Sequence, residues 1–257
     1  MLYAIFVYAW SKTLVAETSD YGDIVITQTY IGQRLLLMHD GVIHSIYKEG
    51  RLTPEGYSYP GSGIADVLSN ANIVTDTAKI LLIGLGAGAM TYYARKEQQW
   101  WCYDIDSAVI AYAKNADLFG FVAICPAQLN IVCADGFAAL EQLRQVDIII
   151  VDAFFADNNL GGVAALTQPL QDAANSLFLI HASGLPEQEI SAVVQLGKNY
   201  GFTGILKDTP LYYNSFGRCS LDDFRYPFRM PAKWIFLSRS MVYIDQCLSL
   251  TGWELLE

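Results

Sequence analysis

The stretch ILLIGLGAGAMTYYARKEQQWWCYDID, residues 80–106, decides the fold of this chain of 257 residues. An apolar run is followed directly by a glycine-spaced turn, a segment of helical length and a second apolar run that ends in carboxylates. Glycine takes the backbone angles of a tight turn and lets a ligand approach the main chain without obstruction by a side chain. This order predicts the βαβ start of a nucleotide-binding sheet, with Asp104 placed to accept the hydroxyl hydrogens of a ribose.

The pattern beyond Lys79 alternates short apolar runs with amphipathic segments. It is typical of a mostly parallel sheet with helices on both faces. The expected strands lie at residues 80–83, 100–105, 130–133, 147–151, 177–181, 203–207 and 234–238. The expected helices lie at residues 64–70, 90–97, 108–119, 136–143, 163–174 and 187–200.

The chain before this region alternates polar and apolar residues in a β manner, and Asp40-Gly41 favours a hairpin turn because both residues tolerate positive φ. The opening MLYAIFVYAW is too short to span a bilayer and has no basic segment of a signal peptide, so it predicts a strand. We therefore expect an α/β protein with a small antiparallel β module at residues 1–60 and a Rossmann-like domain at residues 61–257.

The amino-acid composition limits the classes of ligand that the protein is expected to bind. The formal net charge of -10, from 16 basic and 26 acidic residues, disfavours binding to nucleic acid and suits a small cationic substrate, although solubility alone also explains it. Five cysteines without a CxxC pair indicate a reduced, cytoplasmic setting. The three histidines, His39, His44 and His181, lack metal-ligand spacing, so no metal is expected and each is interpreted as a structural or lining residue.

Carboxylates follow the expected parallel strands, at the edge of the sheet where ligands of such folds bind. Asp104 and Asp106 follow one strand, Asp135 the next, and Asp152 and Asp157 follow the apolar run DIIIV. One Asp after a strand is usually a helix cap, and Asp106 before SAVIAYAK is interpreted in that way. The other carboxylates, Asp104, Asp135, Asp152 and Asp157, predict a ligand-binding site at this edge.

The pieces LLLMHDGVIHS, YSYP, LLIGLGAGAM, YDIDSAVIAYAK, CADGFAAL and VDIIIVDAFFAD stand in the chain in this order. The ordered set resembles the spermidine synthase family of aminopropyltransferases, which use the class I S-adenosylmethionine-dependent methyltransferase fold. The resemblance implies a transferase of polyamine biosynthesis that moves an aminopropyl group from decarboxylated S-adenosylmethionine to an amine such as putrescine. It also implies an N-terminal β module that often mediates oligomerisation, here a homodimer.

The resemblance assigns the donor site residue by residue. Gly84, Gly86 and Gly88 would hold the nucleoside at the turn, Asp104 the ribose hydroxyls and Asp135 the adenine amino group.

The resemblance also assigns the acceptor side. Asp152 falls on the catalytic acid of the family, and a carboxylate there can take the proton of the attacking amine. Asp157 lies one position beyond the second substrate-binding carboxylate of the family and lacks the proline that follows it. Tyr59 and Tyr212 match tyrosines around the amine, and His44 stands where the family usually has a substrate-site Gln.

One departure concerns the donor. The acidic residue that contacts the aminopropyl nitrogen in the family is Ala87 here, so repulsion of the carboxylate of ordinary S-adenosylmethionine is weakened. Three functions therefore stay open: an aminopropyltransferase, an S-adenosylmethionine-dependent methyltransferase, and a non-catalytic nucleoside-binding relative.

Overall fold

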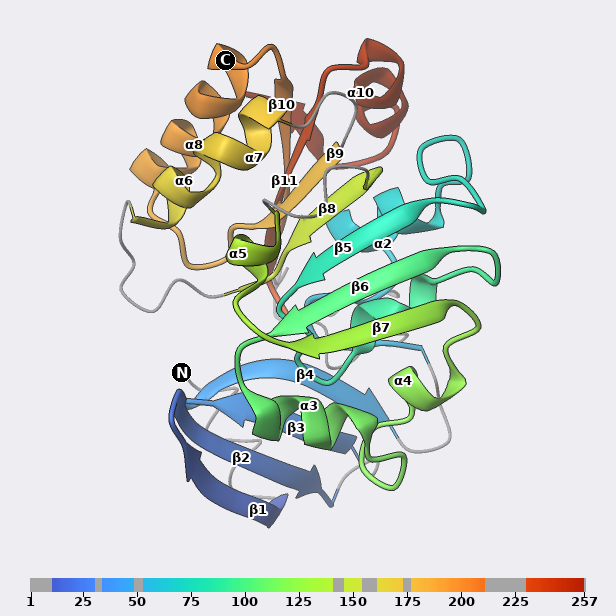
Figure 1. The fold of residues 1–257 in the computed structure, drawn as a ribbon, viewed down its shortest axis with the longest axis vertical. Helices are drawn as coiled ribbons and strands as arrows, with labels where there is room; N and C mark the ends of the chain where they lie inside the picture. The colour runs from blue at the N-terminus through green and yellow to red at the C-terminus, as the bar shows by residue number, and fades with distance from the viewer. Residues whose placement is uncertain are drawn as a thin grey trace, which may run out of the picture.

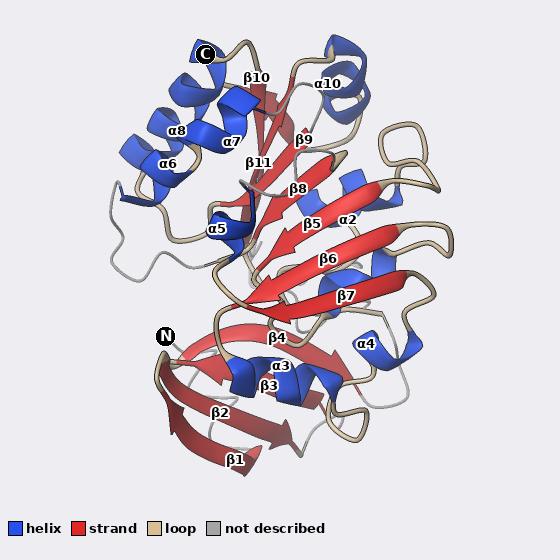
Figure 2. Cartoon of the chain, viewed as in Figure 1, coloured by secondary structure: helices blue, strands red, loops and turns tan. Residues whose placement is uncertain are grey.

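The structure is a computed structural model that describes residues 11–30, 34–48, 53–140, 146–153, 161–172, 177–210 and 230–256. These residues form a four-stranded sheet and an eight-stranded sheet, with helices around the larger one (Figures 1 and 2). The predicted mixed α/β architecture with an N-terminal antiparallel module is confirmed. No helix in these ranges is long and apolar enough to cross a membrane.

The N-terminal module is a meander of consecutive antiparallel strands, β1 (Ser11–Ser19), β2 (Gly22–Thr29), β3 (Arg34–His39) and β4 (Val42–Lys48). The predicted hairpin is confirmed, with positive φ at Asp40 and Gly41. Strand β1 was not predicted, because it is a mostly exposed edge strand without a buried face to impose alternation. The strand predicted within residues 1–10 lies outside the described residues.

The larger sheet has the strand order β12-β10-β11-β9-β8-β5-β6-β7. Strands β5 (Lys79–Ile83), β6 (Gln99–Asp104), β7 (Gln128–Cys133), β8 (Ile148–Val151) and β9 (Leu177–His181) pair in parallel. Strand β11 (Ala232–Ser238) is antiparallel to β9 and to β10 (Thr203–Thr209), and the unpredicted β12 (Trp253–Leu255) is antiparallel to β10. The predicted mostly parallel sheet is confirmed.

Helices cover both faces of this sheet (Figure 1). One face packs on α2 (Gly63–Ser69), α3 (Ser107–Lys114) and the unpredicted α10 (Met241–Leu248), and the other on α6 (Gly161–Ala165), α7 (Thr167–Asp172) and α8 (Glu187–Asn199). Alternate residues of β5 divide between the two cores: Ile80 and Leu82 lie in the first, Leu81 and Ile83 in the second. Burial on both faces explains why the central strands β5, β8 and β9 are continuous apolar runs.

The helix predicted at residues 90–97 is wrong, because the chain forms only the short 3-10 helix η1 (Ala89–Tyr93). Beyond it, the Arg95 guanidinium donates hydrogen bonds to the carbonyls of Leu68 and Val74, and the Gln98 side chain accepts from the Arg95 N–H at 3.0 Å. These contacts draw the backbone out of a helix. Helix α3 likewise ends earlier than predicted, at Asn115, whose side-chain oxygen accepts from the Asp117 N–H at 3.0 Å.

The module and the larger domain share an apolar cluster. It joins β2, β3 and β4 to the glycine turn, to α3 and to the residues around the short α4 (Phe121–Ile124). Tyr47 packs edge-on against Phe119 and Phe121, with ring centroids 6.2 Å and 5.2 Å apart. These contacts hold the module against the side of the larger domain where the parallel strands end and the glycine turn lies. The domain boundary between residues 60 and 61 stays a prediction.

The glycine turn begins at the centre of the sheet, where β5 lies between β6 and β8 and the chain order reverses. Gly84 has φ 90°, and its N–H donates to the Tyr103 carbonyl at 2.8 Å. A Cβ on Gly84 would lie 2.4 Å from the backbone oxygen of Asp152. Only glycine fits there, because a side chain would be strained by φ and would also collide with the end of β8.

We expect Gly84→Ala to lower the free energy of unfolding by about 3 kcal/mol, because backbone strain and the collision add. Gly41→Ala is the matched control, since Gly41 also has positive φ (75°) but has no atom within 4 Å of a Cβ. It should lose only about 1 to 2 kcal/mol. Urea unfolding of both variants checks this, and equal losses would contradict the close contact.

Candidate active site

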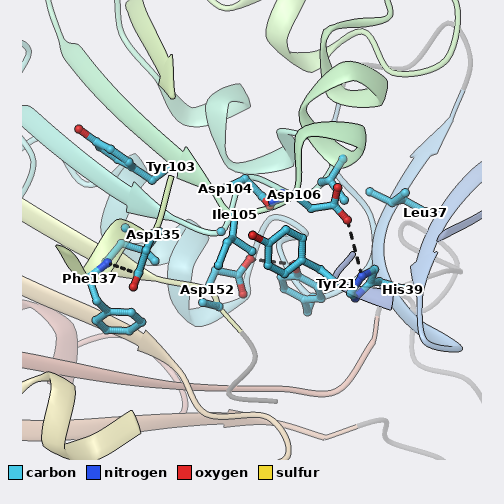
Figure 3. Close-up of a pocket in the computed structure, with 17 residues that line it drawn as sticks. Tyr21, Leu37, His39, Tyr103, Asp104, Ile105, Asp106, Asp135, Phe137 and Asp152 are labelled. Carbon is cyan, nitrogen blue, oxygen red and sulfur yellow. Dashed lines mark hydrogen bonds and ion pairs between the residues drawn. The ribbon is translucent and has the colours of Figure 1, made fainter. Parts of the chain in front are cut away.

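A pocket of about 280 Å³ opens at the carboxyl ends of β5, β6, β7 and β8, with β3 and the turn between β1 and β2 on its other side (Figure 3). Tyr21, Leu37 and His39 line it from the module. From the strand ends, the pocket brings together five of the residues predicted for the site: Gly84, Gly86, Asp104, Asp135 and Asp152. Strand-end geometry alone accounts for this grouping.

Asp104 is tied to the glycine turn. Its Oδ2 accepts hydrogen bonds from the backbone N–H of Leu85 at 2.9 Å and of Gly86 at 3.3 Å, and its Oδ1 accepts from Asp106 N–H at 3.0 Å. Burial raises the pKa of Asp104 above its ordinary value of 3.8, and these backbone donors partly offset that rise. A carboxylate has about four lone-pair sites, and these backbone donors use three of them, so Asp104 can accept about one further hydrogen bond, such as one from a ribose hydroxyl.

Two other strand-end carboxylates cap helices. Asp106 Oδ1 accepts from Ala108 N–H at 2.9 Å and caps α3, as predicted, while its Oδ2 accepts from the Ser19 hydroxyl at 2.5 Å. Asp135 Oδ1 accepts from Phe137 N–H at 2.9 Å at the start of α5 (Gly136–Leu140). His39 Nε2 lies 3.9 Å from Asp106 Oδ2, so the module closes this side of the pocket with polar contacts (Figure 3).

Asp152 follows β8 directly, and its side chain is only 7% exposed. Its Oδ2 accepts a hydrogen bond from the Tyr57 hydroxyl at 2.9 Å, and its Oδ1 lies 2.7 Å from His181 Nδ1. Burial, and next the charge of Asp152, hold the pKa of Tyr57 well above its ordinary 10.0. The tyrosine hydroxyl therefore stays protonated and donates, which fixes one carboxylate oxygen.

Several predicted residues do not line the pocket. Gly88 is the residue before η1 and has φ 80°. A Cβ at Gly88 would lie 2.7 Å from the Val122 side chain, so this glycine serves close packing. Tyr59 is buried and is not among the described residues that line the pocket. The backbone of His44 lies in β4, but its side chain lies outside the described part of the chain, as do Asp157 and Tyr212.

Sequence reasoning did not single out two neighbours of Asp152. Tyr57 is the first tyrosine of the same YSYP segment, and its hydroxyl, not that of Tyr59, contacts the carboxylate. His181 ends β9, so the strand-end rule that selected the carboxylates could also have selected it.

Ala87 is fully buried in the apolar cluster that joins module and domain. Its N–H donates to the Ser45 hydroxyl of β4 at 3.2 Å. The side chain at this position therefore belongs to an internal interface. The described residues contain no group of three His, Cys, Asp or Glu side chains placed to hold a metal ion.

Solved spermidine synthases share this fold. The enzyme from Thermotoga maritima superposes with a TM-score of 0.65 at 16% sequence identity, over 91% of this chain and 75% of that one. A spermidine synthase in complex with the transition state analogue AdoDATO gives 0.60 at 15% identity, over 91% and 75%. A probable spermidine synthase from Corynebacterium glutamicum gives 0.61 at 13%, over 96% and 90%. No protein-family model matches the sequence, and no curated protein matches it. The resemblance is confirmed at the level of the fold.

The raised pKa of Asp104 predicts a pH dependence of stability. Just above pH 3.8 the folded chain holds this proton longer than the unfolded chain, so the free energy of unfolding falls as the pH rises through that window. Asp104→Asn should remove this part of the slope, whereas Asp117→Asn, at an exposed position, should leave it. Urea unfolding at a series of pH values measures it; equal slopes in wild type and Asp104→Asn would refute it.

Proposed function

We propose that this protein is an aminopropyltransferase of the spermidine synthase type, which transfers an aminopropyl group from decarboxylated S-adenosylmethionine to a small amine such as putrescine. One observation carries the proposal: the buried carboxylate of Asp152 shares a pocket with the glycine turn and with Asp104. A group that can take a proton from an amine thus lies beside a place for a nucleoside.

The donor half of the proposal uses the strand ends of β5, β6 and β7. The open backbone of Gly84 and Gly86 faces the nucleoside, Asp104 accepts the ribose hydroxyls, and Asp135 accepts the adenine amino group. The fold supports this arrangement, because sheets of this kind bind ligands outside the carboxyl ends of the strands at the point where the strand order reverses.

The charge of the residues that line the pocket supports the proposed amine acceptor. The described lining includes four carboxylates, Asp104, Asp106, Asp135 and Asp152, and no Lys or Arg. Such a pocket attracts a cation and repels an anion. The pocket suits an amine better than an acidic methyl acceptor.

The reaction needs few groups from the protein. The donor supplies a carbon activated by its positively charged sulfur. The amine nitrogen attacks that carbon, the carbon–sulfur bond breaks, and its electron pair stays on sulfur, which leaves as the neutral thioether methylthioadenosine. Alkylammonium ions have a pKa of about 10, so the attacking nitrogen must lose one proton to expose its lone pair, and Asp152 receives that proton.

A methyltransferase is the second candidate, and Ala87 favours it. Because this residue is buried and uncharged, residue 87 provides no carboxylate to exclude ordinary S-adenosylmethionine. The two candidates differ in the donor that they bind.

Calorimetry with the two donors separates these functions. We expect decarboxylated S-adenosylmethionine to bind more tightly than the ordinary form. Asp104→Ala should weaken binding of either donor and of methylthioadenosine by about 2 to 3 kcal/mol, because hydrogen bonds to a charged group are lost. Tighter binding of ordinary S-adenosylmethionine, together with methyl transfer, would replace the aminopropyltransferase by the methyltransferase.

Asp152→Asn keeps the shape of the side chain and removes the base. We expect the turnover number to fall by about 10²- to 10⁴-fold while methylthioadenosine binding is retained. Asp117→Asn, on the exposed surface, serves as the control and should behave like wild type. Full turnover in Asp152→Asn would assign the base to another residue.

A further inference from the structure

Asp152 is one end of a chain of hydrogen bonds that leads away from the pocket. His181 Nδ1 lies 2.7 Å from Asp152 Oδ1, and His181 Nε2 lies 2.7 Å from the Ser183 hydroxyl oxygen. Strand register places the first pair together, because Val151 and Ile180 are partners in the parallel pairing of β8 and β9. The next residues of the two strands, Asp152 and His181, therefore emerge side by side.

The imidazole ring is held rigidly. It stacks between the rings of Tyr57 and Trp234, with centroid distances of 4.5 Å and 4.7 Å and interplanar angles of 25° and 17°. Trp234 is its antiparallel partner on β11, and the His181 side chain is only 4% exposed. A ring packed on both faces keeps its orientation, so both of its nitrogens stay aimed at their partners.

Ser183 is placed to donate to the second nitrogen of the ring. Its hydroxyl oxygen accepts a hydrogen bond from the Lys233 backbone N–H at 2.8 Å, which leaves the hydroxyl hydrogen free to donate to His181 Nε2. A neutral imidazole that accepts at Nε2 carries its hydrogen on Nδ1 and donates it to Asp152. The order of contacts is that of a Ser–His–Asp triad, but here the carboxylate faces the pocket.

Asp152 is a carboxylate partner of the ring. Tyr57 packs on one face and stays neutral, and Trp234 on the other face does not titrate. The ammonium of Lys233 lies 2.7 Å from Glu187 and 3.5 Å from Asp208. Tyr57 and His181 thus hold the two oxygens of Asp152.

We propose that His181 is a positioning residue of the reaction: fixed by Ser183 as the Nδ1–H tautomer, it orients the Asp152 carboxylate toward the amine. This inference rests on the proposed function.

Two substitutions distinguish the role of the His181 N–H, which donates a hydrogen bond to Asp152, from the role of the aromatic ring. His181→Phe keeps a ring between Tyr57 and Trp234 but removes the N–H, and it should lower the turnover number by about 10- to 100-fold with little change in KM. His181→Asn offers an amide N–H to Asp152. It should restore most of the turnover that His181→Phe loses.

Ser183→Ala tests the tautomer. It should lower turnover less than His181→Phe does, while Ser191→Ala, whose hydroxyl donates to the Glu187 carbonyl on α8, should leave turnover unchanged. Nitrogen NMR of the histidine ring reads the tautomer directly and requires no turnover. The hydrogen should reside on Nδ1 in wild type, and Ser183→Ala should shift it toward a mixture of the two tautomers.

The outcomes are separable. Wild-type turnover in His181→Phe, or a hydrogen on Nε2 in the NMR spectrum of wild type, overturns the positioning role. Equal damage by His181→Phe and His181→Asn shows a purely structural role and overturns it as well. A wild-type protein that binds methylthioadenosine but transfers no aminopropyl group overturns the proposed function instead, and the NMR result still decides how Asp152 is held.

Discussion

The backbone of Gly84 lies directly against the carbonyl of Asp152, and the arrangement of the pocket depends on this contact. A Cβ on Gly84 would come within 2.4 Å of that oxygen, so the absence of a side chain lets the turn after β5 lie over the end of β8. Asp104 holds the same turn from the β6 side through the N–H groups of Leu85 and Gly86. The glycine turn and the buried carboxylate of Asp152 therefore share one pocket, because three neighbouring strands end at the same level, with a glycine after the central one.

The carboxylates of this pocket accept hydrogen bonds from donors that, among the described residues, include no Lys or Arg side chain. Backbone N–H groups bind Asp104, Asp106 and Asp135, whereas Tyr57 and His181 bind Asp152. Neutral donors lower the free energy of a buried carboxylate without cancelling its charge, which an Arg or Lys partner would do. The negative field remains available for a cationic ligand, and this property of the hydrogen bonds connects the fold to the proposed substrate class.

The sequence was sufficient to predict the central parallel strands, because burial on both faces makes β5, β8 and β9 apolar runs. It also predicted that Gly84, Asp104, Asp135 and Asp152 lie together, since chain order and parallel pairing bring strand ends to one edge. It could not distinguish Tyr57 from Tyr59, because the two differ only in the direction that an irregular segment gives them. The sequence also could not predict that His181 stacks on Trp234, because the antiparallel pairing of β9 with β11 joins residues far apart in the chain. The same limit applies to η1, where side-chain contacts of Arg95 and Gln98 override a helical pattern.

Ala87 links the stability of the module to the choice of donor. Its side chain lies in the apolar cluster beneath the module, and its N–H is bound by Ser45, so an Asp at this position would place a charge in an apolar interface. The chain thus has a packing reason to lack the acidic residue that the resemblance leads one to expect. Exclusion of a donor carboxylate does not depend on that residue alone, however. Four aspartates line the described pocket, and a further carboxylate on the donor would be repelled by the field they create together. Under the proposed function, the aspartates that attract an amine also repel the extra carboxylate that distinguishes ordinary S-adenosylmethionine from the decarboxylated donor, even though residue 87 is uncharged.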